Sequence, residues 1–102
     1  MKTQKDISQI HPGEVLLEDF LIPLNITRYR LAKSIGVPQR RIDEICAGKR
    51  GISADTALRL ARFFETDPQS WLNLQSRYDL EVAVDRLAER LNRDIMPFKL
   101  AA

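Results

Sequence analysis

Polar side chains that can read or contact DNA gather in one short stretch of the chain. Gln39, Arg40, Arg41 and Glu44 lie close together, and Lys49 and Arg50 follow a few residues later. Arginine can donate two hydrogen bonds to guanine and glutamine can pair with adenine, whereas lysine and arginine also contact phosphates. These residues therefore predict a nucleic-acid-binding surface.

The distribution of charge supports this interpretation. The whole chain has 102 residues and a formal net charge of +2, but residues 27–51 contain seven basic and two acidic residues, a net charge of +5. A basic patch on a nearly neutral protein is typical of a site for a polyanion. The alternative is that the arginines only form a solvent-exposed helix face and bind nothing.

The elements that must position these residues are all expected to be helices. Apolar residues recur at helical spacing, and caps or breakers separate the segments: Pro12 to Pro23, Thr27 to Gly36, Pro38 to Gly48, from Ser53, and from Asp67. Leu31 and Ala32 fall inside the second helix, Gly36 makes a turn, and Ile42 and Ile45 anchor the third helix to the core. Two helices joined by such a turn form a helix-turn-helix whose second helix enters the major groove.

The sequence also resembles a known family. The stretches IHPGEVLLEDFLIPLNITRYRLAKSIGV and CAGKRGISADTALRLARFFETDPQSWLNLQSRYDLEVA are similar to HigA-type antitoxins, which are Xre (phage-repressor-like) helix-turn-helix proteins. The resemblance covers residues 10–83. It implies an antitoxin that binds a RelE-like mRNA-cleaving toxin, forms a homodimer and represses its own operon on double-stranded operator DNA.

The match also implies individual roles. Gln39, Arg40 and Glu44 correspond to base-reading positions, and Arg28, Lys49 and Arg50 to phosphate contacts. From the residues alone, Arg41 is a further base-reading candidate, and Glu44 either accepts from a cytosine or orients an arginine. The chain differs from the family pattern at Pro38, Asp43 and Glu44.

The expected fold is all-α: a five-helix phage-repressor-like domain over residues 1–83 and an extra C-terminal helix over 84–102. A dimer interface is expected from Trp71 onward, at Trp71, Leu72, Leu74 and Tyr78. Leu80, Val84, Leu87 and Leu91 form a narrow apolar stripe that can pair with another helix.

Other chemistry receives less support. His11, Glu14 and Glu18 superficially suggest a metal site, but no second histidine or nearby cysteine completes it, so no metal or cofactor is expected. Cys46 is the single cysteine and is expected to pack inside the domain. No enzyme active site is visible, and no apolar run is long enough to cross a membrane. A single cysteine excludes an internal disulfide, so the expected location is the reducing cytoplasm. Two alternatives to an antitoxin are a stand-alone repressor and a protein-binding module that no longer reads DNA.

Overall fold

The computed structural model describes residues 9–99, and all elements in this range are helical. In chain order they are α1 (Pro12–Val15), η1 (Leu16–Leu21), α2 (Arg28–Ile35), α3 (Gln39–Cys46), α4 (Ala54–Phe64) and α5 (Pro68–Asp94). α1 and η1 form one continuous helix, in which η1 has the wider π-helical turn. The predicted all-α class and its helix-turn-helix are confirmed.

The helix ends follow local rules that the sequence displays. Pro12 opens α1, and the side chains of Thr27 and Ser53 accept hydrogen bonds from Arg30 N and Thr56 N at the starts of α2 and α4. Gly36 ends α2 with φ 75°, in the left-handed region that glycine adopts without strain. The turn of the helix-turn-helix therefore lies where the sequence predicts it.

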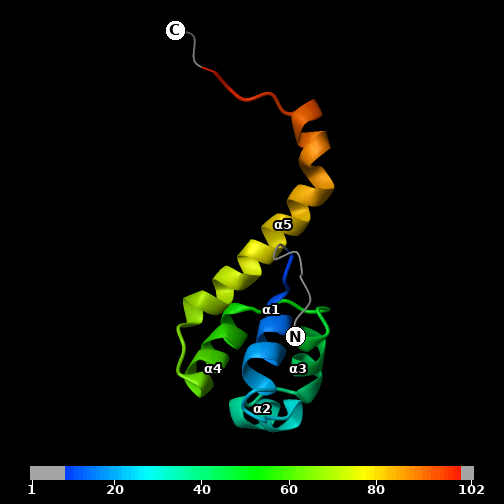
Figure 1. Cartoon of the computed structure of the whole chain (residues 1–102). Coiled ribbons are helices and arrows are strands. Elements are labelled where there is room, and N and C mark those ends of the chain that lie inside the picture. Colours follow the sequence, from blue (N-terminus) through cyan, green and yellow to red (C-terminus); the bar gives the residue numbers. More distant parts are fainter. Residues whose placement is uncertain (1–8, 100–102) are drawn as a thin grey trace.

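The helices α1 to α4, here called the bundle, enclose one apolar core (Figure 1). Every helix contributes to it, and the buried apolar residues are Leu16, Leu21, Leu31, Ala32, Ile35, Val37, Ile42, Ile45, Ile52, Ala57, Leu60, Ala61 and Trp71. α3 packs against both α2 and α1, so the predicted reading helix is supported from two sides.

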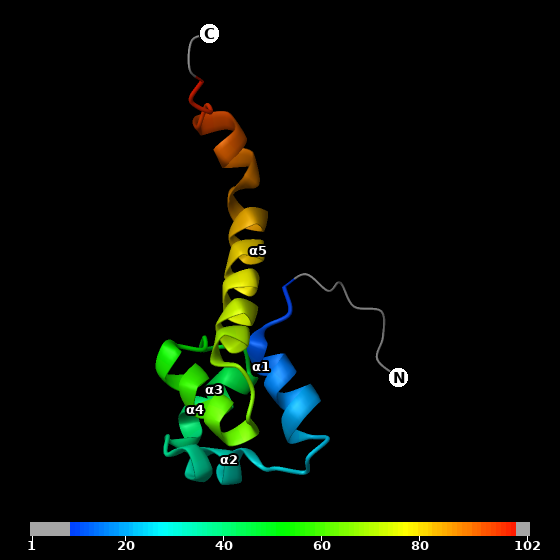
Figure 2. The same ribbon diagram turned by 90° about the vertical axis from the view of Figure 1, so that its left-hand side faces the viewer.

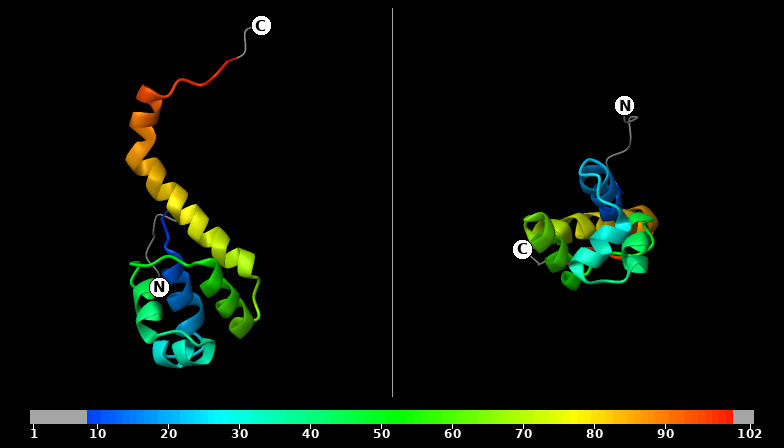
Figure 3. Two further views of the ribbon diagram at one scale, coloured as in Figure 1. Left: turned by 180° about the vertical axis from the view of Figure 1, so that it is seen from behind. Right: turned by 90° about the horizontal axis from the view of Figure 1, so that it is seen from below.

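Helix α5 packs on the bundle with its first turns and then projects away from it (Figure 2). Seen from behind, it leaves the bundle as one unbroken helix (Figure 3). The radius of gyration is 17.3 Å, compared with about 13 Å for a compact chain of this length. No helix within residues 9–99 is both long and apolar enough to cross a bilayer.

The expected extra C-terminal helix is not a separate element. Residues 84–94 continue α5 without a break, so the predicted boundary at 83/84 falls inside a helix, and residues 1–8 and 100–102 lie outside the described range. The sequence has neither glycine nor proline between Pro68 and Pro97, so nothing interrupts the hydrogen-bond ladder there. The division into two units at this boundary remains a prediction.

His11 joins the start of α1 to α5. Its Nδ1 accepts a hydrogen bond from Gly13 N at 2.9 Å, and its ring meets the ring of Tyr78 edge-on with centroids 4.9 Å apart. His11 is therefore the N-cap residue of α1. Burial lowers the pKa of His11 from its ordinary 6.5, against the opposing charges of Asp79 and Glu14.

This arrangement predicts a pH-dependent stability. Because the folded state favours neutral His11, the unfolded chain takes up the proton first, so the free energy of unfolding should decrease as the pH falls below about 6.5. In His11→Asn, the amide oxygen can still cap the helix but does not titrate. The melting temperature should fall between pH 7.5 and pH 5 for the wild type and change little over the same range for the variant. Equal decreases for the two proteins would contradict a role for His11.

Candidate nucleic-acid interface

Helix α3, the predicted recognition helix, has some residues in the core and others on the surface. Ile42 and Ile45 are fully buried and fix the helix to α1 and α2. Gln39 and Arg40 at its first turn are exposed, and 85% of the Arg40 side chain is accessible. The first turn of α3 therefore carries two exposed side chains of types that can hydrogen-bond base edges.

Glu44 binds two arginines of this surface at once. One carboxylate oxygen accepts from Arg40 Nε at 3.0 Å, and the other accepts from Arg50 Nε at 2.9 Å. Hydrogen bonds from Arg40 and then Arg50 hold the pKa of Glu44 below its ordinary value. Of the two roles that the sequence left open, this geometry favours orientation of arginines over acceptance from a cytosine.

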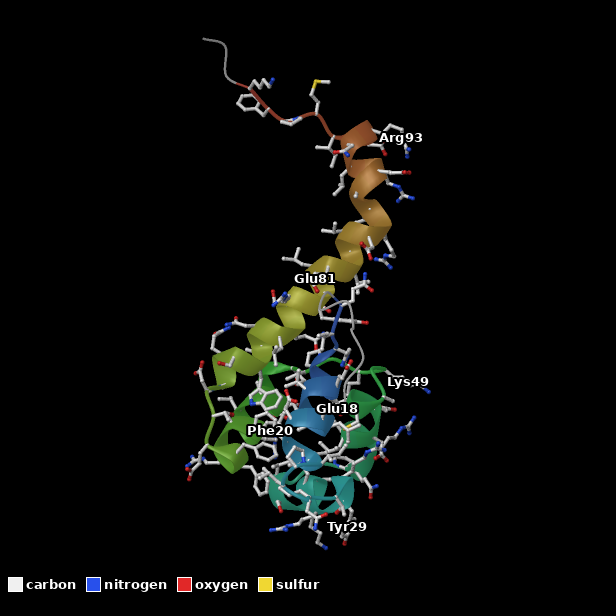
Figure 4. The ribbon with its side chains drawn as sticks, viewed as in Figure 1. Glu18, Phe20, Tyr29, Lys49, Glu81 and Arg93 are labelled. Atoms are coloured by element: carbon white, nitrogen blue, oxygen red, sulfur yellow. The ribbon has the colours of Figure 1, made fainter. Side chains whose placement is uncertain are left out.

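The second acidic residue of α3 is also paired. Asp43 lies 3.8 Å from Arg28 Nη1, at the first turn of α2. Lys49 and Arg50 follow α3 and are exposed, and Figure 4 shows the Lys49 side chain pointing away from the helices. Because arginines pair with both acids, Asp43 and Glu44 need not repel phosphates, which weakens the interpretation as a module that no longer reads DNA.

Arg41 differs from the other predicted site residues. Only 27% of its side chain is exposed, and its Nη1 donates to Asp55 Oδ2 of α4 at 2.9 Å. Arg41, a base-reading candidate from the sequence, is thus turned away from Arg40 and paired with α4 in this structure, so its base-reading role is not supported by this geometry. The guanidinium turns towards α4 because a carboxylate there accepts from it.

Two residues of this region were missed from the sequence. Asp55 and Arg59 are one turn apart on α4, and Arg59 reaches the carbonyls of Ile35 and Gly36. Their i,i+4 spacing is visible in the sequence, but it resembles an ordinary exposed helix pair. Their contacts with α2 and α3 depend on the tertiary fold.

The residues predicted at a dimer interface lie mainly against the bundle. Trp71 is 3% exposed; its ring lies 5.2 Å from that of Phe20, and its Nε1 donates to Thr66 Oγ1. Trp71 is therefore unavailable to a partner, which corrects its predicted role. Leu72 and Leu74 pack partly against the core, and Tyr78 contacts His11.

The apolar stripe further along α5 is accessible instead. Leu80 and Val84 are 63% and 52% exposed, and Leu91 is exposed as well, whereas Leu87 is half-buried.

Cys46 is half-buried on α3, where burial raises the pKa of its thiol, so it remains protonated at neutral pH. This agrees with packing and not with a nucleophile.

Known proteins are similar to this chain in sequence and in fold. The helix-turn-helix family pattern matches residues 17–71. Virulence-associated protein I of Dichelobacter nodosus is 50% identical over 80 residues, which cover 78% of this chain and 74% of that protein.

Two solved structures are similar over almost the whole chain. An addiction module antidote protein of a HigA family from Coxiella burnetii is 40% identical with a TM-score of 0.85, over 90% of this chain and 100% of that one. Pseudomonas aeruginosa antitoxin HigA with the higBA promoter is 40% identical with a TM-score of 0.87, over 89% and 99%. The chain therefore belongs to the Xre-like helix-turn-helix family, and the solved structures that it resembles are HigA-type antitoxins.

Proposed function

We propose that this protein is an antitoxin that binds operator DNA, represses its own toxin–antitoxin operon and neutralises a RelE-like mRNA-cleaving toxin. The observation that carries the proposal is the exposed first turn of α3, which presents Gln39 and Arg40 above a buried Ile42–Ile45 anchor. The similarity to an antitoxin solved with its promoter supports the same use of this helix.

Each polar side chain of the surface has a proposed role. Gln39 and Arg40 read base edges, and Glu44 orients Arg40 and Arg50 by accepting a hydrogen bond from the Nε of each. Arg28, Lys49 and Arg50 contact phosphates, which set the register of the protein on DNA without reading sequence. Charge-assisted pairing limits the rotamers of Arg40 before DNA arrives, so less conformational entropy is lost on binding.

A homodimer would present two such surfaces. The stripe of Leu80, Val84, Leu87 and Leu91 lies on the later turns of α5 and is largely exposed, so a second copy can cover it. Two recognition helices about 34–36 Å apart would then fit an inverted repeat over successive major grooves. Binding there would occlude the promoter.

The experiment that tests operator binding is a protection assay on the DNA immediately upstream of the gene for this protein. A protected inverted repeat with half-sites about 10 base pairs apart is expected. Uniform protection at high protein concentration, without a defined site, would mean that the basic surface binds DNA only electrostatically.

The toxin half of the proposal needs a separate test. The product of the adjacent gene should arrest growth when expressed alone, and co-expression of this protein should restore growth. Copurification of the two proteins should accompany the rescue. A harmless neighbour that does not bind would favour the alternative function, a stand-alone Xre-family repressor.

Lys49 supplies a prediction about salt dependence. Lys49 is exposed beyond the end of α3. Lys49→Ala should therefore lower the affinity for operator DNA and for scrambled DNA by the same factor. The slope of log K against log salt should decrease in magnitude by about one unit, since one phosphate contact is lost. A change confined to operator DNA would show instead that Lys49 reads sequence.

A further inference from the structure

A second set of charged contacts joins the first turns of α4 to the first turn of α3 and to the end of α2. Arg59 Nη1 donates to the carbonyl oxygen of Ile35 at 2.8 Å and lies 3.4 Å from that of Gly36. These carbonyls end α2 and form the turn that leads into α3. A guanidinium here satisfies acceptors that the helix leaves unpaired and complements the negative end of its dipole.

Asp55 connects this cap to the recognition helix. Its carboxylate accepts from Arg59 Nε at 3.1 and 3.2 Å, and its Oδ2 also accepts from Arg41 Nη1 at 2.9 Å. Asp55 stands in the first turn of α4, where the helix dipole favours a negative charge. Hydrogen bonds from Arg59 and Arg41 hold the pKa of Asp55 below its ordinary value, so the carboxylate is ionised at neutral pH.

The two neighbouring arginines of α3 are thereby assigned to different tasks. The Arg40 side chain is 85% exposed, whereas that of Arg41 is 27% exposed and engaged with α4. A base-reading arginine needs its terminal Nη groups available to the groove. Arg40 is held by Glu44 through Nε, whereas Arg41 donates to Asp55 through Nη1. Arg41 instead ties the first turn of α3 to Asp55, and Asp55 is tied through Arg59 to the end of α2.

We propose that Asp55 is a positioning residue for sequence reading: through Arg59 it fixes the turn, and through Arg41 it fixes the start of α3. Gln39 and Arg40 are thereby held at the angle at which they meet base edges, and Arg41 acts through the protein without reading a base. This inference rests on the proposed operator binding, and it names residues that the proposed reading surface does not include.

The test measures affinity for operator and for scrambled DNA with Asp55→Asn in the full chain. Removing a negative charge near DNA should by itself strengthen binding to both sequences. That charge effect alone would leave the ratio of operator affinity to scrambled-DNA affinity unchanged. A positioning role predicts instead that this ratio falls about tenfold, the size of one lost base contact. The matched control is Asp94→Asn, which removes the same charge from the pair with Arg93 at the far end of α5 (Figure 4) and should leave the ratio unchanged.

Two Arg41 variants keep the inference testable even if Asp55→Asn is unstable. Arg41→Lys retains a cation that can pair with Asp55 but lacks the planar guanidinium fork that matches a guanine edge. If Arg41 acts only through Asp55, the ratio should stay within about threefold of the wild type. Arg41→Ala should lower the ratio as much as Asp55→Asn does, and the double variant should be no worse than either one. An Arg41→Lys loss as large as that of Arg41→Ala, or additive effects, would overturn the inference.

The two proposals fail in different ways. A wild type that binds operator and scrambled DNA equally would overturn the proposed function. A wild type that prefers the operator, with a preference that Asp55→Asn leaves unchanged, would overturn the positioning role of Asp55 alone.

Discussion

The Gly13→Ala variant is expected to lose about 3 kcal/mol or more of its free energy of unfolding, a large part of the ~5–15 kcal/mol typical of a domain. A Cβ atom at Gly13 would lie 1.7 Å from the carbonyl oxygen of Ile45 and 2.6 Å from its carbonyl carbon. Both atoms belong to the backbone of α3 and cannot rotate away. The gain of about 1 kcal/mol from alanine in a helix is too small to offset this overlap.

Urea unfolding of Gly13→Ala measures this effect, and Gly51→Ala is the matched control. The atoms nearest to a Cβ at Gly51 would belong to the amide end of the Gln75 side chain, at 3.0–3.1 Å, and a side-chain end can shift where backbone cannot. The control should therefore lose less than about 1 kcal/mol. Equal stabilities of the two variants would contradict the close packing of α1 on the recognition helix.

Val84→Asp is expected to weaken operator binding by about a hundredfold or more. Val84 is 52% exposed on the projecting part of α5, so a carboxylate there should hardly affect the folded protomer. It would place two charges in the apolar seam of the proposed dimer, where their desolvation is costly. A monomer reads one half-site and loses the avidity of two linked contacts.

Sedimentation at micromolar concentrations should give a dimer for the wild type and a monomer for Val84→Asp. Leu24→Asp makes a similar change at a 55% exposed residue between η1 and α2, and it should leave the dimer intact. A dimer that survives Val84→Asp would exclude this stripe as the seam, and a wild-type monomer would contradict the homodimer itself.

Local signals in the sequence predict much of the fold correctly. Thr27 and Ser53 cap helices through their own side chains, and Gly36 adopts the left-handed turn that needs a glycine. Such effects involve residues three or four apart, so they are visible without the fold. The burial of Ile42 and Ile45 follows equally directly from their helical spacing.

Contacts between distant residues could not be predicted in the same way. The apolar periodicity around Trp71 indicates that its face is covered, but it does not distinguish Phe20 of the same protomer from a second copy. The pairing of Arg41 with Asp55 spans 14 residues and requires the start of α4 to lie beside the first turn of α3. The sequence therefore identified the basic surface but not which arginine faces it.

The continuity of α5 was available in the sequence but was obscured by a change of pattern. After Asp79 the broad apolar face that covers the bundle narrows to a stripe. This change favours a separate helix over residues 84–102, whereas in the structure one helix, Pro68–Asp94, leaves the core there. The absence of glycine and proline there was the better guide to backbone structure.

The most direct test of sequence reading by α3 is a titration of wild type and Arg40→Ala with operator and scrambled DNA at two salt concentrations. We expect Arg40→Ala to lose about 1–3 kcal/mol of operator affinity, mostly at one base pair, and to change scrambled binding much less. Equal losses on both DNAs at both salt concentrations would show that Arg40 contributes only charge, and would contradict the assignment of α3 as a sequence-reading helix.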